Sequence, residues 1–204
     1  GRKVWFDPDV FRLNYEGDGK YLGEFQGDEK ILVVTKKGEY HICNFDLTNH
    51  FPTDIHLIEK FEANKVWSAA LFDADQGYAY LKRFAFDASE KPLSFLGDNP
   101  ESRLFLLTDV VFPRVKIIFG GNDDYREPLD IDVEEFIGVK SYKAKGKRIS
   151  NYEVKEVEEL EPIRFPEPET QETMKVEIED ENGDTPISDS DLRDEITGQM
   201  KLFD

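Results

Sequence analysis

The residues best suited to chemistry are basic side chains between positions 140 and 148. Lys140, Lys143, Lys145, Lys147 and Arg148 place five cations in nine residues. Cations clustered in this way bind phosphate groups without reading sequence, and the binding weakens as salt rises. The cluster therefore predicts contact with a nucleic-acid backbone, whereas any single lysine could equally be a solvated surface residue. Tyr142 lies among them, and we expect it to pack rather than to stack on bases.

Smaller basic groups recur in the predicted β-hairpins of this chain. If these hairpins are equivalent units, their turns project from one rim and their cations add into a curved basic stripe. Such a stripe holds a duplex by its phosphates and bends it. The residues concerned are Lys36, Lys37, Lys82, Arg83, Arg103, Arg114 and Lys116.

Other chemistry finds little support in the sequence. No phosphate-binding loop, nucleophile elbow or pair of His ligands at helical spacing is present. His41 and Cys43 share a strand face without a third ligand, and a single cysteine excludes a disulfide framework. Residues 180–184 resemble the start of a calcium loop, but Thr185 occupies the position that requires glycine. We therefore predict no catalytic residue, no metal site and no cofactor in this chain.

The charge is unevenly distributed along the 204 residues, whose net charge is −18. Residues 152–204 contain 18 acids and five bases, a net charge of −13, so the first 151 residues are nearly balanced. An acidic tail of this kind leaves nucleic-acid binding by the rest of the chain open. No apolar run approaches the roughly 18 residues that a membrane helix needs, and we expect no membrane association.

The pattern of residues 1–160 predicts β-structure. Apolar runs and alternating segments are separated by polar turns, which is typical of strand–turn–strand units. Three hairpins are predicted: 31–35 with 39–45, 66–72 with 78–86, and 104–108 with 115–119.

The hairpins repeat. An aromatic residue followed by a small turn stands at Phe25, Phe61, Phe95 and Tyr142, at spacings of 36, 34 and 47 residues. Repeats of about 35 to 45 residues built from short strands are typical of propeller-like blades. We predict an all-β fold of about three blades, each with about four strands. A β-sandwich with chance internal similarity is the alternative.

Residues 161–204 have a different character. Pro162, Pro166 and Pro168 with neighbouring glutamates indicate an extended acidic linker. Ser188 to Ile196 predicts a short helix that is marginal by itself. Gln199, Leu202 and Phe203 lie near the end of the chain, and their order resembles the pentapeptide by which bacterial replication proteins dock on the sliding clamp. The alternative is a terminal segment that packs on its own domain.

Two segments carry a resemblance to a known family. The strand and basic turn Val33–Gly38, and the closing Phe136–Arg148 with its Lys-Ala-Lys-Gly-Lys-Arg ending, resemble the C-terminal domain of bacterial type IIA topoisomerase A subunits. Residues 2 to about 160 are similar to that domain, most closely to the topoisomerase IV type. The resemblance implies a β-pinwheel, a propeller relative whose four-stranded blades exchange elements with their neighbours. The family domain usually has about five or six blades, so this chain would correspond to its second half.

The resemblance also implies what the chain does. It would be a non-catalytic domain that binds and bends duplex DNA, beside the rest of the A subunit and the ATPase B subunit, in the bacterial cytoplasm at the nucleoid. ATP and Mg would be used elsewhere in the intact enzyme, whose catalytic tyrosine has no counterpart here. The basic glycine-rich box of gyrases is also missing. A protein-interaction propeller without nucleic-acid binding is the alternative.

Overall fold

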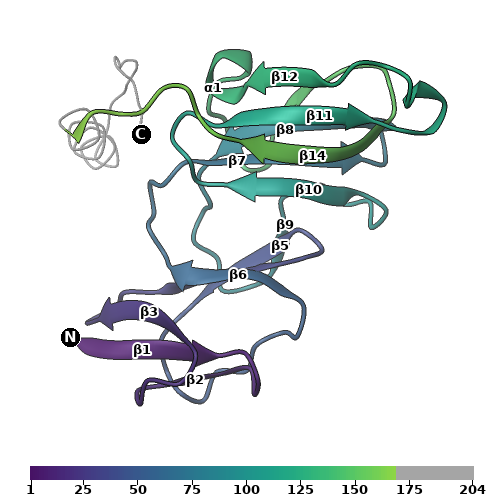
Figure 1. The fold of residues 1–204 in the computed structure, drawn as a ribbon. Helices are drawn as coiled ribbons and strands as arrows, with labels where there is room; N and C mark the ends of the chain where they lie inside the picture. The colour runs from purple at the N-terminus through teal and green to yellow at the C-terminus, as the bar shows by residue number, and fades with distance from the viewer. Residues whose placement is uncertain (169–204) are drawn as a thin grey trace. The chain divides into compact units, whose positions relative to one another are not determined.

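The structure is a computed structural model that describes residues 1–168. Over these residues the chain forms 14 strands in four antiparallel sheets, with one short α-helix and one 3-10 turn (Figure 1). The predicted all-β fold is therefore confirmed. The described residues divide into two compact units, Gly1–Glu62 with Asp87–Phe95, and Ala63–Phe86 with the described residues from Leu96 onward.

The first unit contains two sheets. One has the order β2-β1-β3 and the other the order β6-β4-β5-β9. Val4 and Phe6 of the first sheet pack with Ile31 and Val33 of the second in one buried cluster. The strands are β1 (Arg2–Asp7), β2 (Arg12–Asn14), β3 (Lys20–Phe25), β4 (Ile31–Thr35), β5 (Glu39–Cys43), β6 (Ile55–Lys60) and β9 (Leu93–Ser94).

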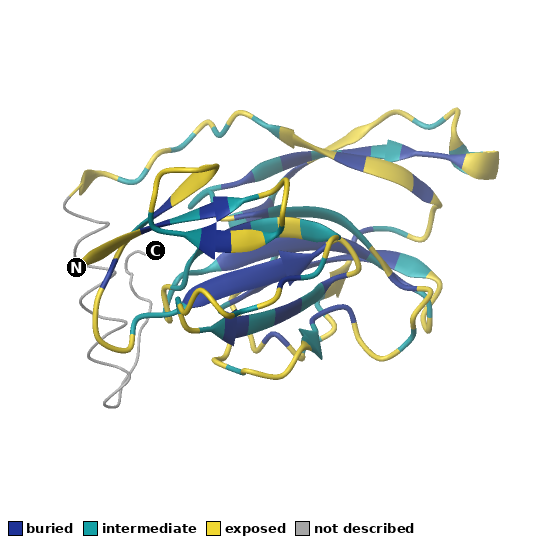
Figure 2. Ribbon diagram, turned by 90° about the horizontal axis from the view of Figure 1, so that it is seen from below, coloured by how far each residue is buried: buried dark blue, intermediate teal, exposed yellow. Residues whose placement is uncertain are grey.

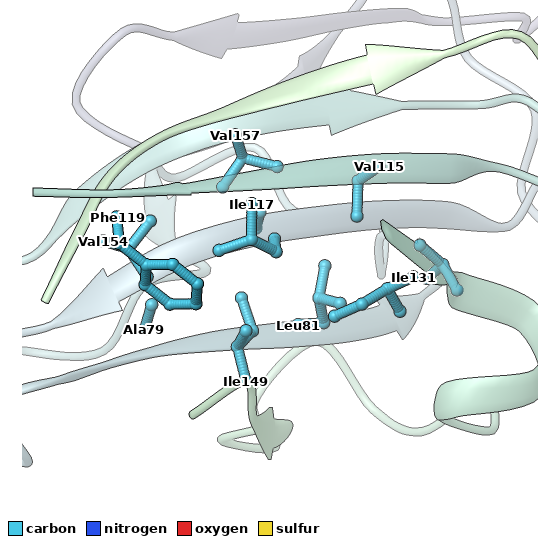
Figure 3. Close-up of a cluster of buried hydrophobic side chains, with 11 residues drawn as sticks. Ala79, Leu81, Val115, Ile117, Phe119, Ile131, Ile149, Val154 and Val157 are labelled. Carbon is cyan, nitrogen blue, oxygen red and sulfur yellow. The ribbon is translucent and has the colours of Figure 1, made fainter. Parts of the chain in front are cut away.

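The second unit also contains two sheets, with the orders β10-β7-β8-β13 and β12-β11-β14. Leu81 of one sheet and Ile117 of the other lie in a shared core, which Ile149 also enters (Figure 3). The elements are β7 (Trp67–Asp73), β8 (Tyr78–Phe84), β10 (Arg103–Thr108), β11 (Arg114–Phe119), η1 (Gly121–Asp123), β12 (Leu129–Asp132), α1 (Val133–Phe136), β13 (Lys147–Arg148) and β14 (Val154–Leu160).

The structure confirms the first two predicted hairpins. β5 alternates between buried and half-buried residues, whereas β4, β7 and β8 are buried almost throughout. β4 pairs with β5 and β7 pairs with β8, each through a short turn. Tyr40 and Ile42 are buried, and His41 and Cys43 on the other face of β5 are half-buried. Figure 2 shows that buried residues follow the strands and that exposed residues gather at the turns.

The predicted third hairpin is wrong. β10 pairs with β7, and β11 pairs with β12 and β14, so residues 109–113 connect two different sheets. The hairpin partner of β11 is β12, which follows the polar segment Gly121–Pro128. An apolar run indicates that a strand exists, but it does not indicate which strand it pairs with.

Both four-stranded sheets take their fourth strand from the next repeat along the chain. β9 follows β8 in sequence but pairs with β5, and β13 follows β12 but pairs with β8. This exchange is the one expected of a pinwheel. The described residues form four sheets rather than about three blades, because β1, β2 and β3 make a sheet that the sequence pattern does not reveal.

Candidate nucleic-acid interface

Residues 137–148, which we call the basic loop, lie along the edge of β8. The loop ends in β13, which pairs antiparallel with β8. Directly after it, the N–H of Ile149 donates to the carbonyl of Ala79 at 2.9 Å. Near the start of the loop, the N–H of Lys140 donates to the carbonyl of Arg83, also at 2.9 Å. The loop is therefore fastened to β8 at both ends.

The five cations predicted to contact phosphate are all exposed, and all lie in this loop. The loop contains no acidic residue, so its formal charge is +5. Tyr142 is only 6% exposed, which confirms that it packs inward rather than stacking on a ligand. An exposed loop of one sign of charge, anchored by a buried aromatic, is suited to binding a polyanion.

Two cations of the loop are held by neighbouring aromatic rings. The Lys147 ammonium lies 4.4 Å from the centroid of the Phe136 ring and donates to the carbonyl of the same residue at 3.2 Å. The Arg148 guanidinium lies 3.9 Å from the Tyr78 ring and donates to Asn151 at 2.9 Å. A guanidinium has five N–H donors, so Arg148 keeps donors for a phosphate.

Acidic neighbours of the loop are few. Lys145 Nζ lies 4.0 Å from Asp73 Oδ2, at the edge of ion-pair distance, and the lysine is well exposed. An exposed pair of this kind contributes little, about 0 to 1 kcal/mol. Asp73 therefore offsets part of the loop's charge, while the Lys145 ammonium stays accessible to a phosphate.

Lys82 and Arg83 are buried, contrary to the exposure that the predicted DNA contact requires. Their exposures are 4% and 7%, since they stand near the C-terminal end of β8, where residues on both faces of the strand are buried. Lys82 Nζ donates to the carbonyl of Tyr142, and Arg83 Nη1 donates to the carbonyl of Ile137 at 3.4 Å. Burial lowers the pKa of Lys82 to about 8 and the pKa of Arg83 to about 10. Neither side chain reaches solvent, and each donates to a backbone carbonyl of the basic loop.

Arg114 and Lys116 lie on the outer face of β11 among acids. Lys116 stands directly opposite Asp130 of β12 and Glu158 of β14. Arg114 pairs with Asp130 at 3.5 Å and donates to a backbone carbonyl at 2.7 Å. Both cations therefore lie beside acids across the sheet, which lowers the positive potential that the sequence predicted there. The pairing of β11 with the acidic β14 decides this, and it joins segments far apart in sequence.

Lys36, Lys37 and Arg103 are exposed, as a phosphate contact requires. Lys36 and Lys37 form the β4–β5 turn of the first unit. The corresponding β7–β8 turn of the second unit contains Asp75 instead, so equivalent turns do not share a charge. A continuous basic stripe across the repeats stays a prediction.

No group of three or more metal-binding side chains occurs among residues 1–168. Burial lowers the pKa of His41 and raises the pKa of the Cys43 thiol to about 11. No helix of the described part of the chain has the length and apolar character to cross a membrane. Gln199, Leu202, Phe203 and the predicted terminal helix lie outside the described residues.

Comparison with known proteins identifies the family. The family model described as Topoisomerase C-terminal domain, Bacteroidota, matches residues 12–161. The match covers well over half of the 204 residues and runs from β2 to the end of β14, with the basic loop inside it. The chain belongs to this family of bacterial topoisomerase C-terminal domains, as the resemblance predicted. No curated protein and no solved structure matches the chain.

Proposed function

We propose that this chain is the non-catalytic DNA-binding domain of a type IIA topoisomerase A subunit of the topoisomerase IV type. The basic loop is its contact with duplex DNA. The observation that carries the proposal is a loop with five exposed cations and no acid, fastened to β8 at both ends. Membership of a topoisomerase C-terminal family supports a role with DNA and association with the rest of the topoisomerase.

The loop would act by electrostatic attraction. Lysines and arginines bind phosphate oxygens and release condensed counterions, so the affinity falls steeply with salt and depends little on base sequence. A duplex held at this loop would be bent and guided relative to the catalytic part of the enzyme. Strand cleavage, ATP and Mg would belong to the rest of the A subunit and to the B subunit, in the bacterial cytoplasm at the nucleoid.

A protein-interaction module without nucleic-acid binding is the second candidate. It is favoured by the net charge of −18 and by the exposed acids Glu156, Glu158 and Glu159 on β14. Such a module would show no salt-dependent retention of duplex DNA, even at low ionic strength. DNA binding by the full chain therefore separates the two candidates.

The test compares two variants of equal charge. The loop variant replaces Lys143, Lys145, Lys147 and Arg148 by Ala, and the control variant replaces Lys3, Arg12, Lys91 and Lys155, which are also exposed. Duplex affinity is measured for both over a range of salt concentrations. We expect the salt slope of the loop variant to fall by about 0.9 for each phosphate that it no longer neutralises. The control variant should keep the slope of the original chain.

Thermal unfolding of both variants should be close to that of the original protein, because exposed substitutions usually change stability by no more than about 0.5 kcal/mol. Equal affinities and equal slopes for the loop and control variants, with both folded, would refute the assignment of the basic loop.

A further inference from the structure

We propose that Lys82, Arg83 and Gly146 are positioning residues for DNA binding. They do not touch DNA, and they hold the basic loop in the shape that presents its cations. This inference rests on the proposed function of the loop. It accounts for two buried cations and for a glycine with a left-handed backbone, none of which the DNA contact itself uses.

Lys82 supports the middle of the loop. Its Nζ reaches from β8 to the carbonyl of Tyr142, the buried aromatic between the exposed lysines. The ammonium also lies 5.2 Å from the centroid of the Phe84 ring, and Asp73 is the charged group that favours its protonated form. A buried ammonium costs free energy, which its hydrogen bond and its ring contact partly offset. The hydrogen bond from Lys82 therefore ties the Tyr142 carbonyl, in the middle of the loop, to strand β8.

Arg83 supports the beginning of the loop through two different groups. Its carbonyl accepts the N–H of Lys140, and its guanidinium donates to the carbonyl of Ile137. Its Nε is buried and has no hydrogen-bond partner among the described residues. The acids that favour its charge, Glu134 and Asp132, lie in and beside α1, the element from which the loop starts. Arg83 therefore ties the start of the loop to β8.

Gly146 lets the end of the loop close onto the strand. Its φ is +93°, and an added Cβ would lie 2.4 Å from the Leu81 carbonyl oxygen and 2.9 Å from the Lys82 Cβ. Any other residue would combine a left-handed backbone with a clash against a strand backbone. Gly138, at the other end of the same loop, is a matched contrast, because an added Cβ there meets nothing within 4 Å.

The three anchors act at the start, middle and end of one short loop. A loop that is ordered before it binds does not lose that conformational freedom on binding, so its affinity is higher for the same set of charges. The number of phosphate contacts is unaltered if the anchors are removed, because the exposed cations remain. Removal of an anchor should thus lower the affinity without changing the salt slope.

The test uses the full chain and pairs each variant with a control of equal charge. Gly146→Ala is compared with Gly97→Ala, a glycine of the same unit that lies outside the loop, has a similar φ of +96° and leaves an added Cβ with nothing within 4 Å. Lys82→Met is compared with Lys65→Met, a lysine of the same unit that pairs with Asp109. We expect Gly146→Ala and Lys82→Met to raise the Kd for duplex about three- to tenfold at low salt, with an unchanged salt slope. The two controls should bind as the original chain does.

Hydrogen exchange gives a local readout. The amide of Lys140, which bonds to β8, should exchange faster in Lys82→Met and Gly146→Ala, while the amides of β11 should keep their protection.

For Arg83, the Lys variant retains a charge and a donor, so it should bind DNA more tightly than the Met variant. If Arg83 only stabilised the fold, two variants of equal stability would bind DNA equally, and Arg83→Lys would not bind more tightly than Arg83→Met.

Several outcomes would overturn the inference. One is faster loop exchange in Gly146→Ala and Lys82→Met with unchanged DNA affinity, since the shape of the loop would then be irrelevant. Another is faster exchange in β11, which would mean that these residues support the whole unit. If the four-residue loop variant also binds normally, the proposed function fails too. If only that variant binds more weakly, the positioning role alone is refuted.

Discussion

Replacing Lys82 by Met should change how the stability of this protein depends on pH. The lysine is 4% exposed, and burial lowers its pKa from 10.5 to about 8, partly opposed by Asp73. The folded protein therefore binds this proton more weakly than the unfolded chain does. Between pH 8 and 10.5 the unfolded chain holds more protons, so the unfolding free energy rises with pH through this group.

The size of this pH-dependent change in unfolding free energy follows from the shift in the Lys82 pKa. The lowering of the Lys82 pKa from 10.5 to about 8 corresponds to at most about 3 kcal/mol of unfolding free energy. This contribution is absent below pH 8 and is fully present above about pH 10.5. Lys82→Met removes the cost of burying the charge, but it leaves the Tyr142 carbonyl without its donor, which costs about 1 to 3 kcal/mol. The two proteins should thus differ little at pH 7. The original protein should become the more stable one as the pH rises.

The measurement is chemical denaturation of both proteins at several values between about pH 7 and pH 10, with Lys155→Met as the control for removal of a lysine. The difference in unfolding free energy between the original chain and Lys82→Met should grow steadily from pH 8 upward. A difference that stays constant over this range, with both proteins folded by the same two-state transition, would show that Lys82 is not a buried ammonium at neutral pH.

The remaining predictions concern the exposed charges and the tail. Lys36→Ala with Lys37→Ala should weaken duplex binding less than the four-residue loop variant, as measured by titration at low salt, and an equal or larger effect would move the main contact to that turn. Arg114→Ala with Lys116→Ala should leave the salt slope unchanged, because both cations lie beside acids across the sheet; a shallower slope would contradict this. Truncation after Pro168 keeps Arg164 with its partner Asp132 and removes most of the acidic tail. It should tighten DNA binding at low salt, where screening is weak, and equal binding would rule out internal competition by the tail. A peptide of residues 188–204 should bind the bacterial sliding clamp, and Leu202→Ala with Phe203→Ala should abolish that binding; no binding at high peptide concentration would refute the docking motif.

Much of the candidate site can be found from the sequence because its charge is local. Five cations within nine residues of one loop are visible without knowing any long-range contact, and their exposure agrees with that expectation. Lys82 and Arg83 have the same residue types, so the sequence predicts the same role for them. Their burial follows from β13 and residues 137–148 covering the edge of β8, which no local pattern reveals.

For the strands too, local pairings can be predicted from the sequence and long-range pairings cannot. Alternation and turn residues predict β4–β5 and β7–β8, since both partners of each hairpin lie within a few residues of one another. The pairing of β10 with β7 instead of β11 depends on contacts between distant segments, and so does the pairing of β11 with β14. The sheet of β1, β2 and β3 escapes the sequence pattern because its strands contain no long apolar run.

Sequence patterns are enough to predict the all-β class, the two local hairpins, the family resemblance, the acidic composition of the tail and the positive charge of residues 140–148. Each of these is encoded by neighbours along the chain. Long-range contacts in the folded protein are needed to show which cations reach solvent, which of them face acids across a sheet, and which donate to carbonyls of the basic loop. These properties depend on burial and strand pairing, which bring together residues such as Lys82 and Tyr142 that are 60 positions apart.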